Sequence, residues 1–153
     1  MRAEDQFHIG VVAADFEATM STLSSVFGYQ WGPEAGGPIA VTLPTGEAVL
    51  DLRCVFSTTE PRVEIVRSIP DTLWEPVAGS GIHHLGFWSD DVAADTAQLE
   101  RYGYVVEAAR AVSGTPFFAF LTGKSGVRIE LVTRAAQEGL ARCWADPETI
   151  GQQ

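Results

Sequence analysis

Basic residues are scarce in this chain. Lysine occurs once, at Lys124, and lysine and arginine together number 10 against 20 aspartates and glutamates, so the formal net charge is −10 at pH 7. Binding to nucleic acid or to an anionic membrane surface requires a basic patch that neutralises phosphates. The charge balance therefore argues against both kinds of partner.

Cysteine is also rare, and long apolar runs are missing. Cys54 and Cys143 form no metal or redox motif, and Cys54 lies in an apolar run that is typical of a core. The first ten residues, MRAEDQFHIG, include two acids and no apolar signal region, and no stretch approaches the length of a membrane span. We therefore expect a cytoplasmic protein whose thiols stay reduced.

The chain does contain an internal repeat. Similar segments recur in the same order: HIG at 8–10 and HLG at 84–86, FGY at 27–29 and YGY at 102–104, RVEIV at 62–66 and RIELV at 128–132. Order-preserving matches of this kind indicate a duplicated structural unit. We expect a first module over 1–67, a linker over 68–81 that is rich in proline and glycine, a second module over 82–134, and a C-terminal helix and tail over 135–153.

Each module has the pattern of a βαβββ unit, which places the chain in the α+β class. The predicted strands cover 6–13, 39–43, 48–56 and 62–67 in the first module, and 83–89, 104–110, 116–121 and 127–133 in the second. Asp15 is the predicted N-cap of a helix over 16–27, and Gly28 ends that helix. Its inward stripe is Phe16, Met20, Leu23 and Phe27; the second helix, from 92 to Gly103, turns Val92, Leu99 and Tyr102 inward. Pro147 is expected to end the C-terminal helix.

One histidine and one glutamate occupy equivalent strand positions in each module. His8 and His84 lie on the first strands, and Glu64 and Glu130 lie on the last strands. Alternation puts a glycine two residues after each histidine on the same face, which leaves space beside the imidazole. Two imidazoles and two carboxylates that converge in one cavity predict a divalent metal site, for zinc, nickel, cobalt, iron, manganese or magnesium.

Each of these histidines and glutamates, taken alone, also has a purely structural explanation. A buried carboxylate needs a partner, and Arg62 and Arg128 lie two residues before Glu64 and Glu130 on the same strand face, so each pair could be an ion pair. A histidine on a strand is commonly a hydrogen-bonded core residue. The equivalent positions of all four residues in the repeat favour the metal site.

The sequence resembles the vicinal oxygen chelate superfamily, also called the glyoxalase/bleomycin-resistance/extradiol-dioxygenase superfamily. The resemblance rests on FHIGVVAADFEATMSTLSSVFGY, RVEIV, GSGIHHLGFWSDDV and RIELV. It implies two tandem modules that form a cupped, eight-stranded mixed sheet with helices on its outer face. It also implies a single divalent ion bound by His8, Glu64, His84 and Glu130, and a homodimer.

Within that family, a His-Glu-His-Glu set resembles the glyoxalase lyases, whereas GIHHLGFW resembles the methylmalonyl-CoA epimerases, which usually have glutamine in place of Glu64. The implied function is a metal-dependent lyase, isomerase or epimerase whose small-molecule substrate chelates the ion through neighbouring oxygens. Two alternatives are a protein that sequesters a small molecule and an iron-dependent ring-cleaving dioxygenase, against which Glu64 argues.

Several roles stay open at this level. Glu64 or Glu130 could take the proton of the substrate, and Glu47 and Asp51 are other candidates for the base. His83 cannot easily bind the same ion as its neighbour His84, so a structural or supporting role is expected. Candidates for the substrate pocket are Trp88, Phe118, Phe120, Arg62 and Arg128.

Overall fold

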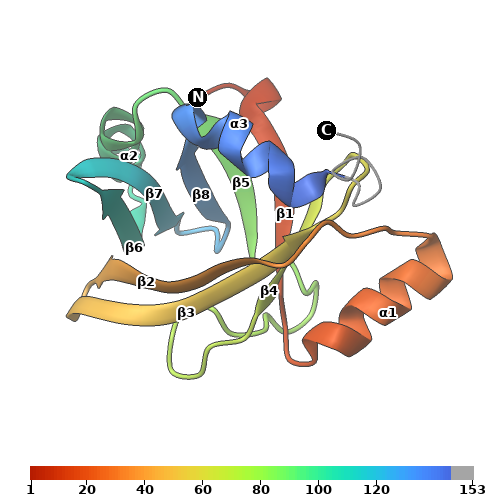
Figure 1. Cartoon of the computed structure of the whole chain (residues 1–153). Coiled ribbons are helices and arrows are strands. Elements are labelled where there is room, and N and C mark those ends of the chain that lie inside the picture. Colours follow the sequence, from red (N-terminus) through yellow and green to blue (C-terminus); the bar gives the residue numbers. More distant parts are fainter. Residues whose placement is uncertain (146–153) are drawn as a thin grey trace.

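Eight strands close into a barrel-like sheet in the order β1-β4-β3-β2-β6-β7-β8-β5 (Figure 1). The structure is a computed structural model and describes residues 1–145. The strands are β1 (Gln6–Ala13), β2 (Ala35–Leu43), β3 (Gly46–Phe56), β4 (Val63–Arg67), β5 (His84–Ser89), β6 (Val105–Val112), β7 (Thr115–Thr122) and β8 (Arg128–Thr133). The predicted α+β class and the cupped, eight-stranded mixed sheet are confirmed.

Each half of the chain contributes four strands in the same arrangement. β1 runs parallel to β4, and β5 runs parallel to β8. The halves meet where β1 pairs antiparallel with β5, and on the far side of the barrel β2 and β6 share one registered pair, Thr42 with Ala109. The first strands of both modules therefore lie side by side at the centre of the molecule.

Two helices cover the outer face, and each begins at a capping aspartate. The Asp15 side chain accepts a hydrogen bond from the amide of Ala18 at the start of α1 (Phe16–Phe27), and Asp91 caps α2 (Val92–Arg101) in the same way. Gly28 and Gly103, with φ of 75° and 85°, follow the helices in the left-handed conformation that favours glycine. The sequence predicted both helices and both ends.

The predicted inward stripes are wrong at one end of each helix. Phe16 is buried, and Met20 and Leu23 pack beside it, but Phe27 is 70% exposed and Tyr102 is 77% exposed. Phe27 lies in the last turn of α1, where that helix leads away from the sheet, and Tyr102 follows the last residue of α2 (Figure 1). The apolar periodicity of each helix extends to these two positions. The sheet does not extend beneath them, so their side chains remain exposed.

The segment that joins the modules contributes to the core. Residues 68–83 form neither helix nor strand, yet Trp74 within them is 0% exposed and packs edge-on against Phe120 with ring centroids 5.4 Å apart. After β8 the chain forms a short helical stretch, made of η2 (Arg134–Ala136), α3 (Gln137–Leu140) and η3 (Ala141–Trp144). Pro147 lies outside the described residues. Among residues 1–145, no helix is long and apolar enough to cross a membrane.

Candidate metal centre and cavity

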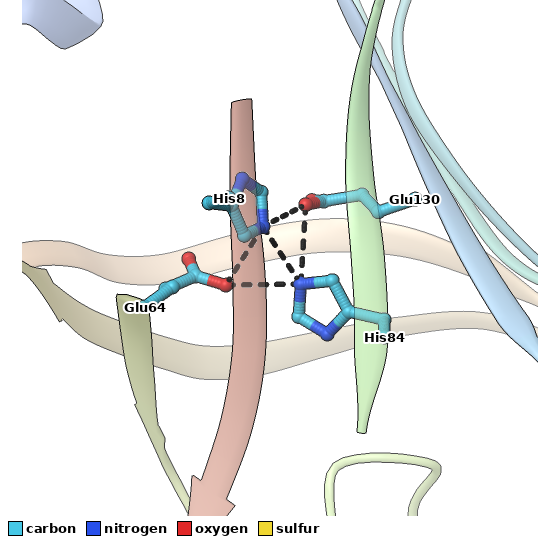
Figure 2. Close-up of side chains that lie close together, drawn as sticks. All are labelled: His8, Glu64, His84 and Glu130. Atoms are coloured by element: carbon cyan, nitrogen blue, oxygen red, sulfur yellow. Dashed lines mark hydrogen bonds and ion pairs between the residues drawn. The ribbon is translucent and has the colours of Figure 1, made fainter. Parts of the chain in front are cut away.

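Two histidines and two glutamates point toward one another on the inner face of the sheet (Figure 2). His8 from β1, Glu64 from β4, His84 from β5 and Glu130 from β8 each offer one ligand atom, and these atoms lie within 4.8 Å of one another. All four side chains are buried, and Glu130, the most exposed, is 8% accessible. The structure thus brings together the four residues that the repeat makes equivalent in sequence, and we call them the quartet.

Two cross-strand rows build the quartet, and each has a glycine at its centre. Gly10 pairs with Glu64 on one side and with His84 on the other, and Gly86 lies in the same way between His8 and Glu130. A Cβ atom at Gly10 would lie 1.9 Å from Cε1 of His84, and one at Gly86 would lie 1.9 Å from Cε1 of His8. Each imidazole therefore occupies the space that a side chain at the opposite glycine would fill.

We expect Gly10→Ala and Gly86→Ala to displace an imidazole and abolish metal binding. The forced contact should also lower the free energy of unfolding by about 1–3 kcal/mol, the usual cost of overpacking. Metal titration calorimetry and urea unfolding measure the two effects. Gly139→Ala is the control, because a methyl group there meets no atom within 4 Å. Unchanged metal affinity in both variants would contradict the packing argument.

The spacing and chemistry of the donor atoms fit a divalent ion. Nε2 of His8 lies 3.1 Å from Oε2 of Glu130 and 3.4 Å from Oε2 of Glu64. For His84 the corresponding distances are 3.1 Å to Glu64 and 3.4 Å to Glu130, and the two Nε2 atoms are 2.9 Å apart. Bonds of roughly 2.0–2.1 Å to one ion separate neighbouring ligand atoms by about 2.9–3.4 Å. The quartet could therefore hold one metal ion.

The neighbouring arginines do not neutralise the quartet. Arg62 pairs with Glu60 and donates to the carbonyl oxygens of Ser57 and Thr58, and Arg128 pairs with Glu107. The partners of Glu64 and Glu130 are imidazoles instead. The alternative ion pairs, Arg62 with Glu64 and Arg128 with Glu130, therefore do not form.

The protein's own charges shift the pKa of each quartet member. Burial by itself would lower the pKa of His8, but the charges and hydrogen bonds of Glu64 and Glu130 outweigh burial and raise this pKa to about 9. The same carboxylates raise the pKa of His84 against burial. In return the imidazoles hold the pKa of both carboxyl groups below the usual range, although burial acts to raise it. A metal ion must therefore compete with protons.

Metal affinity should consequently rise with pH. An imidazole binds a metal only when its nitrogen is deprotonated, and the folded protein holds the proton of His8 up to a pKa of about 9. Apparent affinity at pH 7 should be about a hundredfold lower than above pH 9, with roughly a tenfold gain per pH unit between them. Competition with a chelator of known pH dependence measures this slope. A flat profile from pH 7 to 9 would contradict this competition between the metal ion and the proton on His8.

His83 holds His84 in a defined tautomer. Nε2 of His83 lies 2.7 Å from the carbonyl oxygen of Leu73, which can only accept, so this nitrogen carries the hydrogen. Burial and the adjacent His84 lower the pKa of His83 to about 4, and the ring stays neutral. Its Nδ1 then accepts from Nδ1–H of His84 at 2.9 Å, so the neutral form of His84 presents a lone pair at Nε2 to the other three members of the quartet. By contrast, Nδ1 of His8 has no partner among the described residues.

His83→Phe keeps a ring in place and removes the acceptor for His84. We expect the affinity for a divalent ion to fall 10–100-fold, the usual cost of losing the partner of a metal-ligating histidine. His83→Gln, whose amide can both donate and accept, should restore part of the affinity. Metal titration calorimetry with a circular dichroism check of folding measures both variants. Equal affinities in wild type and His83→Phe would refute this positioning role.

An apolar cavity of about 200 Å³ opens from the quartet. His8, Glu64 and Glu130 contribute to its wall, whereas His84 does not. The other lining residues are mostly aromatic or aliphatic: Phe7, Ile39, Leu52, Phe56, Val66, Trp74, Phe117, Phe118, Phe120, Val132 and Leu140. Pockets that enclose drug-sized ligands measure roughly 300–1,000 Å³. This cavity suits a smaller molecule, or the reactive end of a larger one.

The structure divides the predicted pocket residues. Phe118 and Phe120 line the cavity. Trp88 stacks on Phe7 with centroids 3.7 Å apart and, with Arg62, borders a neighbouring and more polar depression instead. Arg128 is engaged with Glu107 and does not line the cavity. Alternation places Trp88 correctly on the inner face, but that face is wider than the cavity.

The other two candidates for the base, Glu47 and Asp51, do not contribute to the cavity wall. Glu47 is exposed and accepts a hydrogen bond from the hydroxyl of Thr42, and exposed Asp51 pairs with Arg53. Within this site, Glu64 and Glu130 are therefore the carboxylates that a bound molecule would meet.

Sequence reasoning missed several cavity residues. Cys54, assigned to the core, lines the cavity, and so does Arg110. Phe56 and Phe120 extend the two rows, since Phe56 pairs with Glu64 and Phe120 with Glu130, and their rings lie edge-on to His8 and His84. Phe120 was already among the predicted pocket residues, and comparing CVF at 54–56 with FAF at 118–120, in the strands before RVEIV and RIELV, would have added Phe56.

Comparison with known proteins agrees with this architecture. The profile of the Glyoxalase/Bleomycin resistance protein/Dioxygenase superfamily matches residues 7–120. A methylmalonyl-CoA epimerase variant from Streptomyces coelicolor, in complex with 2-nitronate-propionyl-CoA, is similar in structure with a TM-score of 0.60 and 24% identity over 86% of this chain and 95% of that one. The epimerase from Mycobacterium tuberculosis gives a TM-score of 0.57 and 17% identity over 90% and 92%. No curated protein matches the sequence.

Proposed function

The chain belongs to the Glyoxalase/Bleomycin resistance protein/Dioxygenase superfamily, and from that membership we propose that it is a divalent-metal-dependent enzyme. It would remove a proton from a carbon next to a carbonyl, as an epimerase, isomerase or lyase. The observation that carries this proposal is the buried quartet at the wall of an apolar cavity. A small molecule with neighbouring oxygens fits both parts of that arrangement.

His8, Glu64, His84 and Glu130 would hold the ion, and His83 would keep His84 in the tautomer that binds it. When bound, the ion supplies Lewis-acid stabilisation of the charge that develops on a carbonyl oxygen of the substrate. The apolar lining excludes water, which strengthens that electrostatic effect. These residues would thus bind the ion, orient its ligands and exclude water from the substrate.

A carboxylate of the quartet would move the proton. Glu64 and Glu130 both line the cavity, and they come from different rows of the sheet. A carboxylate oxygen of one could take the proton from the substrate, and a carboxylate oxygen of the other could return it to the opposite side. This two-base arrangement suits inversion at carbon and favours an epimerase over a lyase.

Two measurements test the proposal. Protein purified without a chelator is analysed for bound metals, before and after reconstitution with zinc, nickel, cobalt, manganese, iron(II) or magnesium ions. The metal-loaded protein is then incubated in D₂O with candidate substrates, and exchange of the hydrogen next to the carbonyl is followed by NMR. Methylmalonyl-CoA is the first candidate, because a similar structure is a complex with it. No bound metal after reconstitution would refute the proposal.

A second candidate function rests on the cavity lining alone. An aromatic and apolar wall also suits a protein that sequesters a small molecule without turnover. Such a protein would bind its ligand equally well with and without a chelator, and would catalyse no hydrogen exchange. Assembly into a homodimer stays a prediction, which light scattering coupled to size-exclusion chromatography can test.

A further inference from the structure

We propose that Arg110 binds a carboxylate of the substrate at the side of the cavity away from the quartet. The substrate class is then a small molecule that carries neighbouring oxygens at one end and a carboxylate at the other, with an apolar body between them. The oxygen-bearing end rests on the proposed function, whereas the carboxylate end rests on Arg110 alone.

Register places Arg110 at a defined separation from the quartet. Glu130 on β8 pairs with Phe120 on β7, which pairs with Ala108 on β6, and Arg110 follows two residues later on the same face as Ala108. Two strand spacings and two residues along the strand give roughly 12 Å between the Cα atoms of Arg110 and Glu130. A molecule with a ring or a short chain between its polar ends spans the gap that remains between the side chains.

The rest of the cavity gives the arginine no competing charge. Outside the quartet, Arg110 is the only acidic or basic side chain among the described residues that line the cavity. With a divalent ion in place, the two carboxylates of the quartet are balanced by the two charges of the ion. The guanidinium of Arg110 then dominates the electrostatic potential of the cavity, and it attracts an anion.

Arg110 also differs from the other arginines of the sheet. Arg53, Arg62, Arg67 and Arg128 each pair with an acidic side chain. Arg110 forms no ion pair with any residue in the described part of the chain, although acids outnumber bases 20 to 10. Its guanidinium lies 5.4 Å from the ring centroid of Phe117, which also lines the cavity.

This contact with Phe117 leaves the arginine able to bind a ligand. When a guanidinium lies over an aromatic ring, none of the five N–H donors of the guanidinium forms a hydrogen bond. These donors form a planar fork that matches the two oxygens of a carboxylate. The ring restricts the side chain, so less rotamer freedom is lost when an anion binds. Arg110 lies where β2 meets β6, between the cavity and a second depression beneath α2. A carboxylate held there would project the rest of the molecule inward.

Calorimetric titration with a matched pair of probes tests this assignment. The probes are 4-phenylbutyrate and 4-phenylbutanamide, which share a body and differ in charge. Each is titrated into wild type, Arg110→Met and Arg110→Lys, both cobalt-loaded and treated with EDTA. Arg101→Met on α2 is the control for loss of an arginine away from the cavity, because Arg101 does not line it. Thermal unfolding of every variant verifies the fold.

We expect the wild type to bind 4-phenylbutyrate at least tenfold more tightly than 4-phenylbutanamide, the difference in affinity typical of charge-assisted hydrogen bonds. Arg110→Met should bind both probes equally, Arg110→Lys should keep part of the preference, and Arg101→Met should keep all of it. A preference that survives in Arg110→Met overturns the proposal, and so does a wild type that binds both probes equally or binds neither. If the wild type binds no metal but keeps an Arg110-dependent preference, the proposed function fails and this assignment stands.

Discussion

Glu64→Ala or Glu130→Ala should each lower the affinity for a divalent ion by about a thousandfold or more, and should abolish hydrogen exchange of the substrate. Losing a mere partner of a ligand typically costs 10–100-fold, and these changes remove a charged ligand outright. Each variant also removes a carboxylate that raises the pKa of His8, so protons compete less with the metal, but this gain offsets only a small part of the loss of a ligand. Chelator competition and NMR exchange in D₂O measure the two losses.

Milder and distant substitutions make this prediction specific. Glu64→Gln keeps an oxygen donor and removes one negative charge, so we expect an affinity between those of wild type and Glu64→Ala. Glu47→Ala and Asp51→Ala remove exposed carboxylates outside the cavity and should change neither metal affinity nor exchange. If Glu47→Ala abolished exchange while metal binding persisted, the base would lie outside the quartet.

Trp74→Ala should lower the free energy of unfolding by about 3–5 kcal/mol, the range for truncating a large buried aromatic. Trp74 is 0% exposed, although it lies in a segment without helix or strand. It packs against Phe120, which pairs with Glu130, so the loss should also loosen one row of the quartet. Urea unfolding followed by circular dichroism measures the free energy, and metal titration measures the effect on the row.

Two other variants separate packing from the general effect of removing an aromatic ring. Trp74→Phe should recover part of the stability, because a smaller ring fills part of the same volume. Phe27→Ala removes a side chain that is 70% exposed and should change the free energy of unfolding by less than about 0.5 kcal/mol. Similar losses for Trp74→Ala and Phe27→Ala would contradict the role of Trp74 in the core.

Most of the correct predictions rest on the internal repeat, because equivalent sequence positions in the two modules take equivalent places in the fold. Strand alternation fixed the face of His8 and of Glu64, and the repeat then placed His84 and Glu130 at matching positions. Both helices were predicted because Asp15, Gly28 and Gly103 are local signals that need no tertiary information. The family match and the barrel of eight strands confirm the predicted class.

The features that were missed depend on contacts between segments that no local pattern joins. Pro- and Gly-rich surroundings made the segment around Trp74 read as a linker, although its backbone carbonyl at Leu73 orients His83. Arg110 gave no signal, since an arginine on a strand is common and only the seam between β2 and β6 places it at the cavity. The tautomer of His84 likewise depends on a hydrogen bond between adjacent side chains.

The two cross-strand rows of the quartet each join one half of the chain to the other. One row joins Glu64 and Gly10 of the first half to His84 of the second, and the other joins His8 of the first half to Gly86 and Glu130 of the second. A single ion held by all four would act as a reversible staple between two halves of the polypeptide. Binding energy for the metal would then appear as resistance of the β1–β5 seam to separation, and chelation should speed amide hydrogen exchange along that seam first.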